Sequence, residues 1–199
     1  MTRTTVLLLG VTVAVLAGCG ETGRAADELA AVTDRIPSTV IGPEGGEVRW
    51  YLPESANELG DGAEVRILVD SESVPHARLG AFVQTTGASG IPVHAHTWQA
   101  EILYVISGRG VALVGDGTEE VPLEPGSLVY VPDRSWHGVR NTDSDDRLKI
   151  LLITNPPDGD ALAGFFRNAT TRPGEPPLDL SMEDVVALIE TYGMELPPE

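Results

Sequence analysis

Three of the four histidines in this sequence, together with one glutamate, have the types and spacing for metal chemistry. His94 and His96 are separated by one residue within a run typical of a β-strand, so both imidazoles project from the same face. Glu101 begins the next predicted strand, with Leu103 and Val105 following it on the same face. A carboxylate carried into such an apolar interior is costly to bury unless a cation compensates it.

The third histidine, His137, lies on a later predicted strand and could close the site from a neighbouring position. Imidazole and carboxylate groups together suit divalent transition metals, and this mixed set permits Mn, Fe, Co, Ni, Cu or Zn. The pattern therefore predicts one divalent ion, against the alternative of a polar cluster retained without metal. The fourth histidine, His76, follows a proline in a polar loop and is predicted to be a surface residue. The predicted metal ligands are His94, His96, Glu101 and His137.

Short runs of β-branched, aromatic and aliphatic residues from Gly45 to about Asn155 predict the β scaffold that these side chains require. The tail changes to helical spacing, which predicts short helices around 162–166 and 182–189. Ser181 and Asp184 can cap the second helix, and Gly193 can end it. The expected strands are 47–52, 63–70, 78–85, 91–97, 101–107, 109–115, 118–124, 127–131, 136–141 and 147–154.

Two ordered motifs in this region resemble those of the cupin superfamily. His94-x-His96, four residues, Glu101, six residues and Gly108 resemble the first motif. The second motif is matched by glycine, five residues, proline, then histidine, three residues and asparagine, at Gly126, Pro132, His137 and Asn141. The resemblance implies an all-β fold, a double-stranded β-helix of the cupin or jelly-roll type, with short C-terminal helices added.

The resemblance also implies the division of the chain and shows where it departs from the family. We expect the cupin barrel over 45–155 and a C-terminal helical extension over 156–199. The family usually has glycine at the positions of Ala88 and Arg134, so the loop conformations there are open, and Arg134 could place a cation at the cavity mouth. Tyr130 and Trp136 could line that mouth, although aromatic residues on strands are more often core.

The first residues resemble a bacterial lipoprotein signal. An apolar run from Val6 to Gly18 has the length of a signal-peptide core rather than of a membrane span. It ends in Leu16-Ala17-Gly18-Cys19, which resembles a lipobox whose cysteine is lipidated. We therefore expect a signal peptide over 1–18, lipidation of Cys19 and a flexible tether over 19–44 with one short helical stretch at Ala25–Val32. The expected location is extracytoplasmic, lipid-anchored to the bacterial cell membrane.

Charge limits the partners. The 199 residues include 13 basic and 30 acidic residues, a formal net charge of −17, which excludes a surface suited to nucleic acid. The expected contact with a membrane is through the lipid anchor alone, and a homodimer is left open. Three neutral imidazoles and one carboxylate around a divalent ion leave a net charge of about +1, so the expected partner is a small, anionic molecule.

The sequence leaves open whether the site catalyses a reaction, and which class of reaction that is. Resemblance of the tail layout to small single-cupin proteins of the quercetin-dioxygenase type favours a metal-dependent dioxygenase acting on a small anionic or enolic substrate. In such an enzyme Glu101 is a ligand that could also act as a catalytic base. The alternatives are a non-catalytic cupin that binds a small ligand and a cupin isomerase or epimerase, because fold and metal do not fix the reaction.

Overall fold

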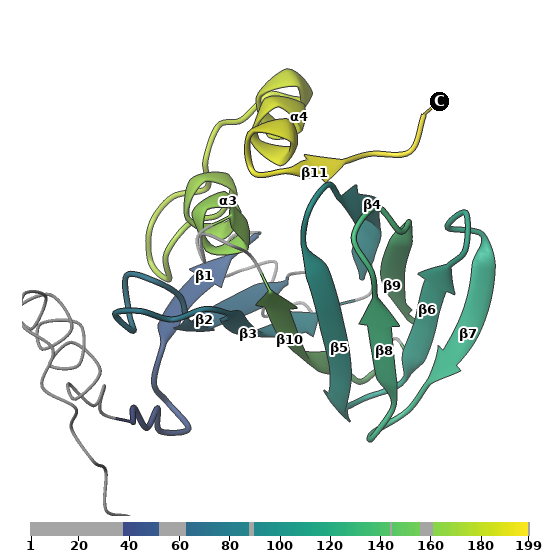
Figure 1. Ribbon diagram of the computed structural model, residues 1–199, viewed down its shortest axis with the longest axis horizontal. Helices are drawn as coiled ribbons and strands as arrows, with labels where there is room; N and C mark the ends of the chain where they lie inside the picture. The colour runs from purple at the N-terminus through teal and green to yellow at the C-terminus, as the bar shows by residue number, and fades with distance from the viewer. Residues whose placement is uncertain (1–37, 52–62, 88–89, 144, 156–160, 199) are drawn as a thin grey trace, which may run out of the picture. The chain divides into compact units, whose positions relative to one another are not determined.

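The computed structural model describes residues 38–51, 63–87, 90–143, 145–155 and 161–198. The predicted signal peptide, Cys19 and the helical stretch at Ala25–Val32 lie outside them, so those expectations stay predictions. Residues 40–199 form one structural unit, and the architecture given below is that of this unit. Its described residues fold into two antiparallel β-sheets followed by two short helices (Figure 1). The expected all-β fold with C-terminal helices is confirmed.

The larger sheet has six strands, in the order β1-β2-β3-β10-β5-β8. The last strand of the barrel, β10, lies between β3 and β5 and pairs with both of them, although they come much earlier in the chain. The strands are β1 (Glu47–Trp50), β2 (Glu64–Val69), β3 (Gly80–Thr86), β5 (Ala100–Ser107), β8 (Leu128–Val131) and β10 (Leu148–Asn155).

The smaller sheet has five strands, in the order β11-β4-β9-β6-β7. It carries all three histidines of the predicted metal site, on the neighbouring strands β4 and β9. The strands are β4 (Ile91–His96), β6 (Gly110–Val114), β7 (Glu119–Leu123), β9 (His137–Asn141) and β11 (Met194–Glu195). The first ten strands in chain order match the ten that the sequence predicts, within about two residues at each end.

The core lies between the two sheets because side chains alternate along each strand. In β10, Leu148, Ile150 and Leu152 are buried, while the residues between them face outwards or lie at the boundary. Leu152 lies opposite Leu103 of β5 on one side and Phe82 of β3 on the other. The same alternation leaves the outer face of β5 and β8 apolar and exposed, as at Tyr104, Leu128 and Tyr130.

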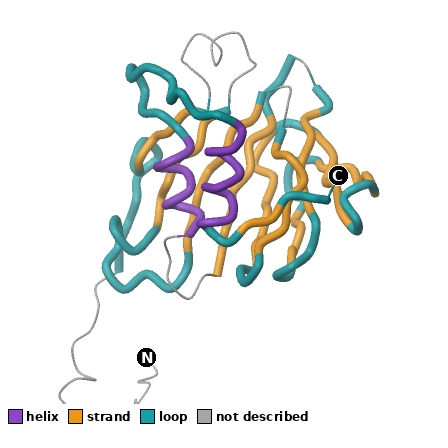
Figure 2. The backbone as a smooth tube through the Cα atoms, turned by 90° about the horizontal axis from the view of Figure 1, so that it is seen from above, coloured by secondary structure: helices purple, strands orange, loops and turns teal. Residues whose placement is uncertain are grey.

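The tail forms two helices, α3 (Ala161–Ala169) and α4 (Met182–Thr191), which lie side by side (Figure 2). As the sequence predicts, Ser181 caps α4 by a reciprocal capping box with Asp184, and Gly193 follows in the left-handed conformation. Neither helix of the described region has the length and apolar content that crossing a bilayer requires.

One element of the tail differs from the expectation of helices alone. Met194 and Glu195 form β11, which pairs with the end of β4 and places Met194 opposite His96. The amide of Thr97 also donates to the carbonyl oxygen of Gly193 at 2.8 Å. A two-residue strand is too short to produce a periodic pattern, so this pairing has no signal in the sequence.

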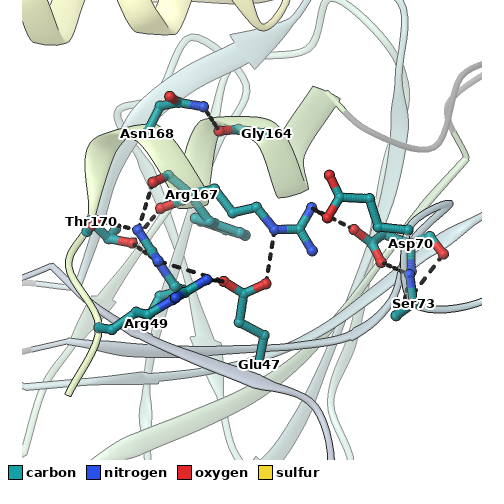
Figure 3. Close-up of polar contacts among 11 residues, drawn as sticks. Glu47, Arg49, Asp70, Ser73, Gly164, Arg167, Asn168 and Thr170 are labelled. Carbon is teal, nitrogen blue, oxygen red and sulfur yellow. Dashed lines mark hydrogen bonds and ion pairs between the residues drawn. The ribbon is translucent and has the colours of Figure 1, made fainter.

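A polar network fixes the C-terminal end of α3 to the larger sheet (Figure 3). Arg167 pairs with Asp70, whose side chain is fully buried, at 2.7 Å, and with Glu47 of β1 at 2.8 Å. Arg49 donates to the carbonyl oxygen of Arg167 at 2.6 Å. Burial opposes ionisation of Asp70, but hydrogen bonds from Ser73 and Arg167 outweigh it and hold the pKa of that carboxyl below its usual value.

This network predicts a pH-dependent contribution to stability. Since the pKa of Asp70 is lower in the folded state, its contribution is present above the unfolded pKa of about 4 and is lost as the pH falls through the folded value. We expect Asp70→Asn to lower the free energy of unfolding by about 1–3 kcal/mol at pH 7, because it leaves a half-buried guanidinium poorly compensated. In urea unfolding, the difference in unfolding free energy between this variant and the wild type should be smaller at pH 3 than at pH 7.

The matched control is Glu72→Gln, because Glu72 also faces Arg167, at 3.4 Å, but is 71% exposed. Exposed ion pairs contribute little, so this variant should unfold close to the wild type at both pH values. Equal stabilities of Asp70→Asn and Glu72→Gln at pH 7 would contradict the structural role assigned to the buried pair.

Candidate metal centre

A β-bulge in β4 sets the direction of His94. Ile91 pairs with Val139 and His94 with His137, so three steps along β4 match two steps along β9. A bulge of this kind inserts one residue and re-aims the side chains that follow it. His94 and His96 both follow the bulge, which preserves the predicted spacing of two between them. Their rings lie on the same side, with centroids 5.0 Å apart.

The two strands approach closely here because glycine occupies the contact positions. Gly90 has φ of +78°, and a Cβ atom there would lie 2.1 Å from the carbonyl oxygen of Val139. Gly138 lies against the bulge, where a Cβ atom would come within 3.0 Å of the Ile91 carbonyl oxygen. Both positions leave almost no room for a side chain, so the glycines allow β9 to carry His137 against His94. The ring centroids of these two histidines are 4.3 Å apart.

The opposite sheet supplies the carboxylate. Glu101 is the second residue of β5 and is only 3% exposed. Its Oε2 lies 3.0 Å from Nε2 of His137 and 3.6 Å from Nε2 of His96. One potential ligand atom from each of four residues lies within 4.8 Å of the others, and we call this group the histidine–glutamate cluster. Its members are His94, His96, Glu101 and His137.

Backbone carbonyl groups orient two of the imidazoles. Nδ1 of His94 lies 2.9 Å from the carbonyl oxygen of Pro92, and Nδ1 of His137 lies 2.9 Å from that of Ser135. A carbonyl oxygen only accepts, so each Nδ1 carries the proton and donates. In the neutral form that binds a metal, the lone pair of each ring is then on Nε2, on the side of the cluster. Metal-binding histidines in proteins are commonly held in this way.

His96 provides an independent test of whether a metal fits. It is 1% exposed, and neither of its nitrogens has a hydrogen-bond partner among the described residues. Burying an imidazole removes its hydrogen bonds to water, and this cost in free energy is not compensated when the ring has no partner in the protein. A divalent ion held between the two sheets would give Nε2 of His96 a partner and would neutralise Glu101. The donor set therefore fits a divalent transition metal.

The protonation states suit a cation. Burial, together with the neighbouring His137 and His96, lowers the pKa of His94 to about 3. Burial opposes ionisation of Glu101, yet hydrogen bonding to His137 and the nearby imidazole of His96 outweigh it and lower the pKa of this carboxyl to about 2. At neutral pH His94 is thus a neutral imidazole and Glu101 a carboxylate, and these are the forms that coordinate metals.

The cluster opens into a cavity of about 560 Å³. Three of its members, His94, Glu101 and His137, line this space, and most of the remaining wall is apolar. The tail supplies much of that wall from both helices and from β11. The apolar lining residues of the tail are Leu162, Phe165, Phe166, Ala169, Met182, Val185, Ile189, Met194 and Leu196.

Two polar residues of the cavity were not singled out from the sequence. Tyr51 follows β1 and its ring meets Phe166 edge to face, while Gln84 projects from β3 beside the core. Burial, with a smaller contribution from the charge of Glu101, raises the pKa of Tyr51 above its usual value, so this hydroxyl stays protonated. The alternation of side chains along β3 places Gln84 on the inner face of the strand, and this pattern in the sequence could have identified it as a cavity residue. Tyr51 has no such pattern, because its place depends on how the strand ends.

Other residues lie away from the cavity. Arg134 adopts φ of +59°, so the loop keeps the left-handed conformation that favours glycine, and its Nε donates to the carbonyl oxygen of Thr97. Arg134 is not among the described residues that line the cavity, so the expected cation is not part of its wall. Tyr130 is 63% exposed, so the expectation of a core position was wrong, and neither it nor Trp136 is among the lining residues. His76 is exposed, as the sequence predicts.

Comparison with known proteins gives a match in the same region. Residues 82–154, from β3 to β10, match the Cupin_2 model, a cupin domain. An oxalate-binding protein from Thermotoga maritima is 28% identical over 105 residues, which are 51% of this chain and 84% of that protein.

Solved structures of low sequence identity were also found. A predicted oxalate decarboxylase from Thermotoga maritima has a TM-score of 0.48 and 19% identity, covering 59% of this chain and 98% of its own. A cupin-2 domain protein from Rhodospirillum rubrum has a TM-score of 0.46 and 22% identity, covering 79% and 89%. The matched residues 82–154 include all four members of the histidine–glutamate cluster, which lies between the two antiparallel sheets.

Proposed function

We propose that this protein is a metal-dependent cupin that acts outside the cytoplasm on a small anionic or enolic substrate, with dioxygenase activity. The observation that carries the proposal is the histidine–glutamate cluster, buried between the sheets and open to a cavity of about 560 Å³. In this proposal one divalent transition metal is held by the Nε2 atoms of the three histidines and by the Glu101 carboxylate. Bound there, the metal would supply an electrophilic centre of net charge about +1, which attracts an anion.

The other groups in the cavity favour this chemistry over isomerisation or epimerisation. Moving a proton between carbon atoms requires a base, and usually an acid, beside the substrate. Outside the cluster, Tyr51 is the one titratable residue among the described lining residues, and its raised pKa keeps the hydroxyl protonated, so it is not available as a base. Its protonated hydroxyl is suited to donating a hydrogen bond to a substrate oxygen. Glu101 could act as a base only by leaving its place as a ligand.

A second candidate function is binding without turnover. The relative from Thermotoga maritima is named an oxalate-binding protein, and the described residues that line the cavity supply no separate acid–base pair. A metal centre that captures a small anion would explain the same geometry. Activity measurements, rather than the arrangement of the residues, distinguish the two candidates.

The sequence supports an extracytoplasmic location through the lipobox-like Leu16-Ala17-Gly18-Cys19. In this proposal the lipid on Cys19 is the only attachment to the membrane, because the acidic body of the protein gains nothing from anionic headgroups.

The metal site predicts a loss of bound metal in defined variants. The purified protein should contain about one divalent ion per chain, as measured by elemental analysis after dialysis. Glu101→Gln keeps the size of the side chain but removes its charge, and His94→Ala removes one ligand, so both should lower metal affinity by at least about tenfold. His76→Ala is the matched control, because it removes an exposed histidine outside the cavity. Unchanged metal content in both site variants would refute the proposed ligand set.

Oxygen consumption separates the enzyme from the binder. With the metal-loaded protein, we expect uptake of dioxygen in the presence of an enolisable substrate such as a flavonol or a β-diketone. We expect none with the Glu101→Gln variant, because the site needs its metal for this chemistry. Stoichiometric binding of these compounds without oxygen uptake would favour the binding function over the dioxygenase.

The lipoprotein proposal predicts that membrane attachment depends on the thiol of Cys19. In a bacterial host supplied with radiolabelled palmitate, the wild-type chain should carry label and sediment with membranes. Cys19→Ser should remove both properties, because it removes the only thiol of the chain. Label or membrane sedimentation that persists in Cys19→Ser would overturn the proposal.

A further inference from the structure

The wall of the cavity carries few polar side chains besides those of the cluster. Among its described lining residues, the polar side chains are Tyr51, Gln84 and three members of the cluster, His94, Glu101 and His137. The rest of the lining is aliphatic, aromatic or glycine, and it contains no lysine or arginine. The space therefore has a polar region at the proposed metal and a largely apolar remainder.

Helix α4 presents an apolar face that the rest of the protein covers only in part. None of its residues is buried, although Val185 and Ile189 line the cavity and Met182, also a lining residue, is 74% exposed. The helix is nevertheless well formed, with a complete capping box at Ser181. An ordered helix with its apolar stripe on a cavity gains stability when an apolar group fills that cavity.

A small dicarboxylate suits this space poorly. Oxalate could place one oxygen of each carboxylate on the metal, but its two outer oxygens would then face apolar wall, with no cationic side chain among the described lining residues to pair with them. Burying an unpaired charge in this way is expensive. A molecule of that size would also leave most of the 560 Å³ unfilled. Oxalate is thus a poor match to the cavity, even though a relative is named for binding it.

We propose that the natural ligand is amphipathic, with one chelating oxygen head at the histidine–glutamate cluster and a bulky apolar body that extends beneath α3 and α4. This inference rests on the proposed metal site and specifies the substrate class for it. Tyr51 and Gln84 lie among the lining residues as hydrogen-bond donors for the oxygen head. Phe165, Val185 and Ile189 form the wall against which the apolar body packs.

The test compares three chelators on the zinc-loaded protein by calorimetry: oxalate, pentane-2,4-dione and 1-phenylbutane-1,3-dione. The two diones share a chelating head and differ by one phenyl group in place of a methyl group. Affinities are corrected for the intrinsic affinity of each compound for free Zn²⁺. We expect the phenyl compound to bind at least about tenfold more tightly than pentane-2,4-dione, because it buries additional apolar area, and oxalate to bind most weakly.

Two variants locate the apolar subsite. Val185→Asp places a charge on the cavity face of α4 and should remove the preference for the phenyl compound, while zinc content stays that of the wild type. Ala187→Asp is the matched control, because Ala187 lies on the exposed face of the same helix, and it should change the preference by less than about twofold. Phe165→Leu alters the wall without adding a charge and should reduce the preference even if Val185→Asp unfolds the helix.

The outcomes separate this inference from the proposed function. If the protein takes up no zinc, the proposed metal site is refuted, and this inference with it. If zinc binds but the two diones have equal corrected affinities, or oxalate binds most tightly, the amphipathic substrate class alone is refuted. A phenyl preference that survives both Val185→Asp and Phe165→Leu would also refute it, because the apolar body would then lie elsewhere.

Discussion

The burial of one carboxylate constrains much of this structure. Glu101 is almost fully shielded from water, and a charge in that position requires compensation that apolar neighbours do not supply. Hydrogen bonding to His137, and the nearby His96, hold it in the ionised form. Each of these partners comes from the opposite sheet. The polar centre is thus also a contact that joins the two sheets.

Keeping the three imidazoles on one side of Glu101 requires unusual backbone geometry. The bulge in β4 aims His94 and His96 inwards, and Gly90 and Gly138 allow β9 to lie against it. The carbonyl groups of Pro92 and Ser135 then fix which nitrogen of two rings faces the centre. Because the backbone holds these rings in place, a metal ion would bind there with little rearrangement and low entropic cost.

The tail is part of the site as well as an extension of the barrel. β11 pairs with the strand that carries His96, and the network around Arg167 and Asp70 fixes α3 to the larger sheet. Both attachments hold apolar residues of the tail over the cavity rather than away from it. The barrel therefore supplies the polar end of the cavity and the tail supplies much of the apolar end. A division of this kind allows the ligand to change with the tail while the metal centre is retained.

The sequence by itself determined the fold class, the first ten strands and the four residues that the structure brings together, because each left a local signal. Strand alternation put Glu101, Leu103 and Val105 on one face, and the His-x-His spacing put two rings on another. Metal binding and lipidation of Cys19 stay predictions. Only the tertiary structure decided the pairing of β11, the exposure of Tyr130 and the place of Tyr51 in the cavity. These depend on contacts between segments far apart in the chain, and such contacts leave no period or spacing in either segment alone.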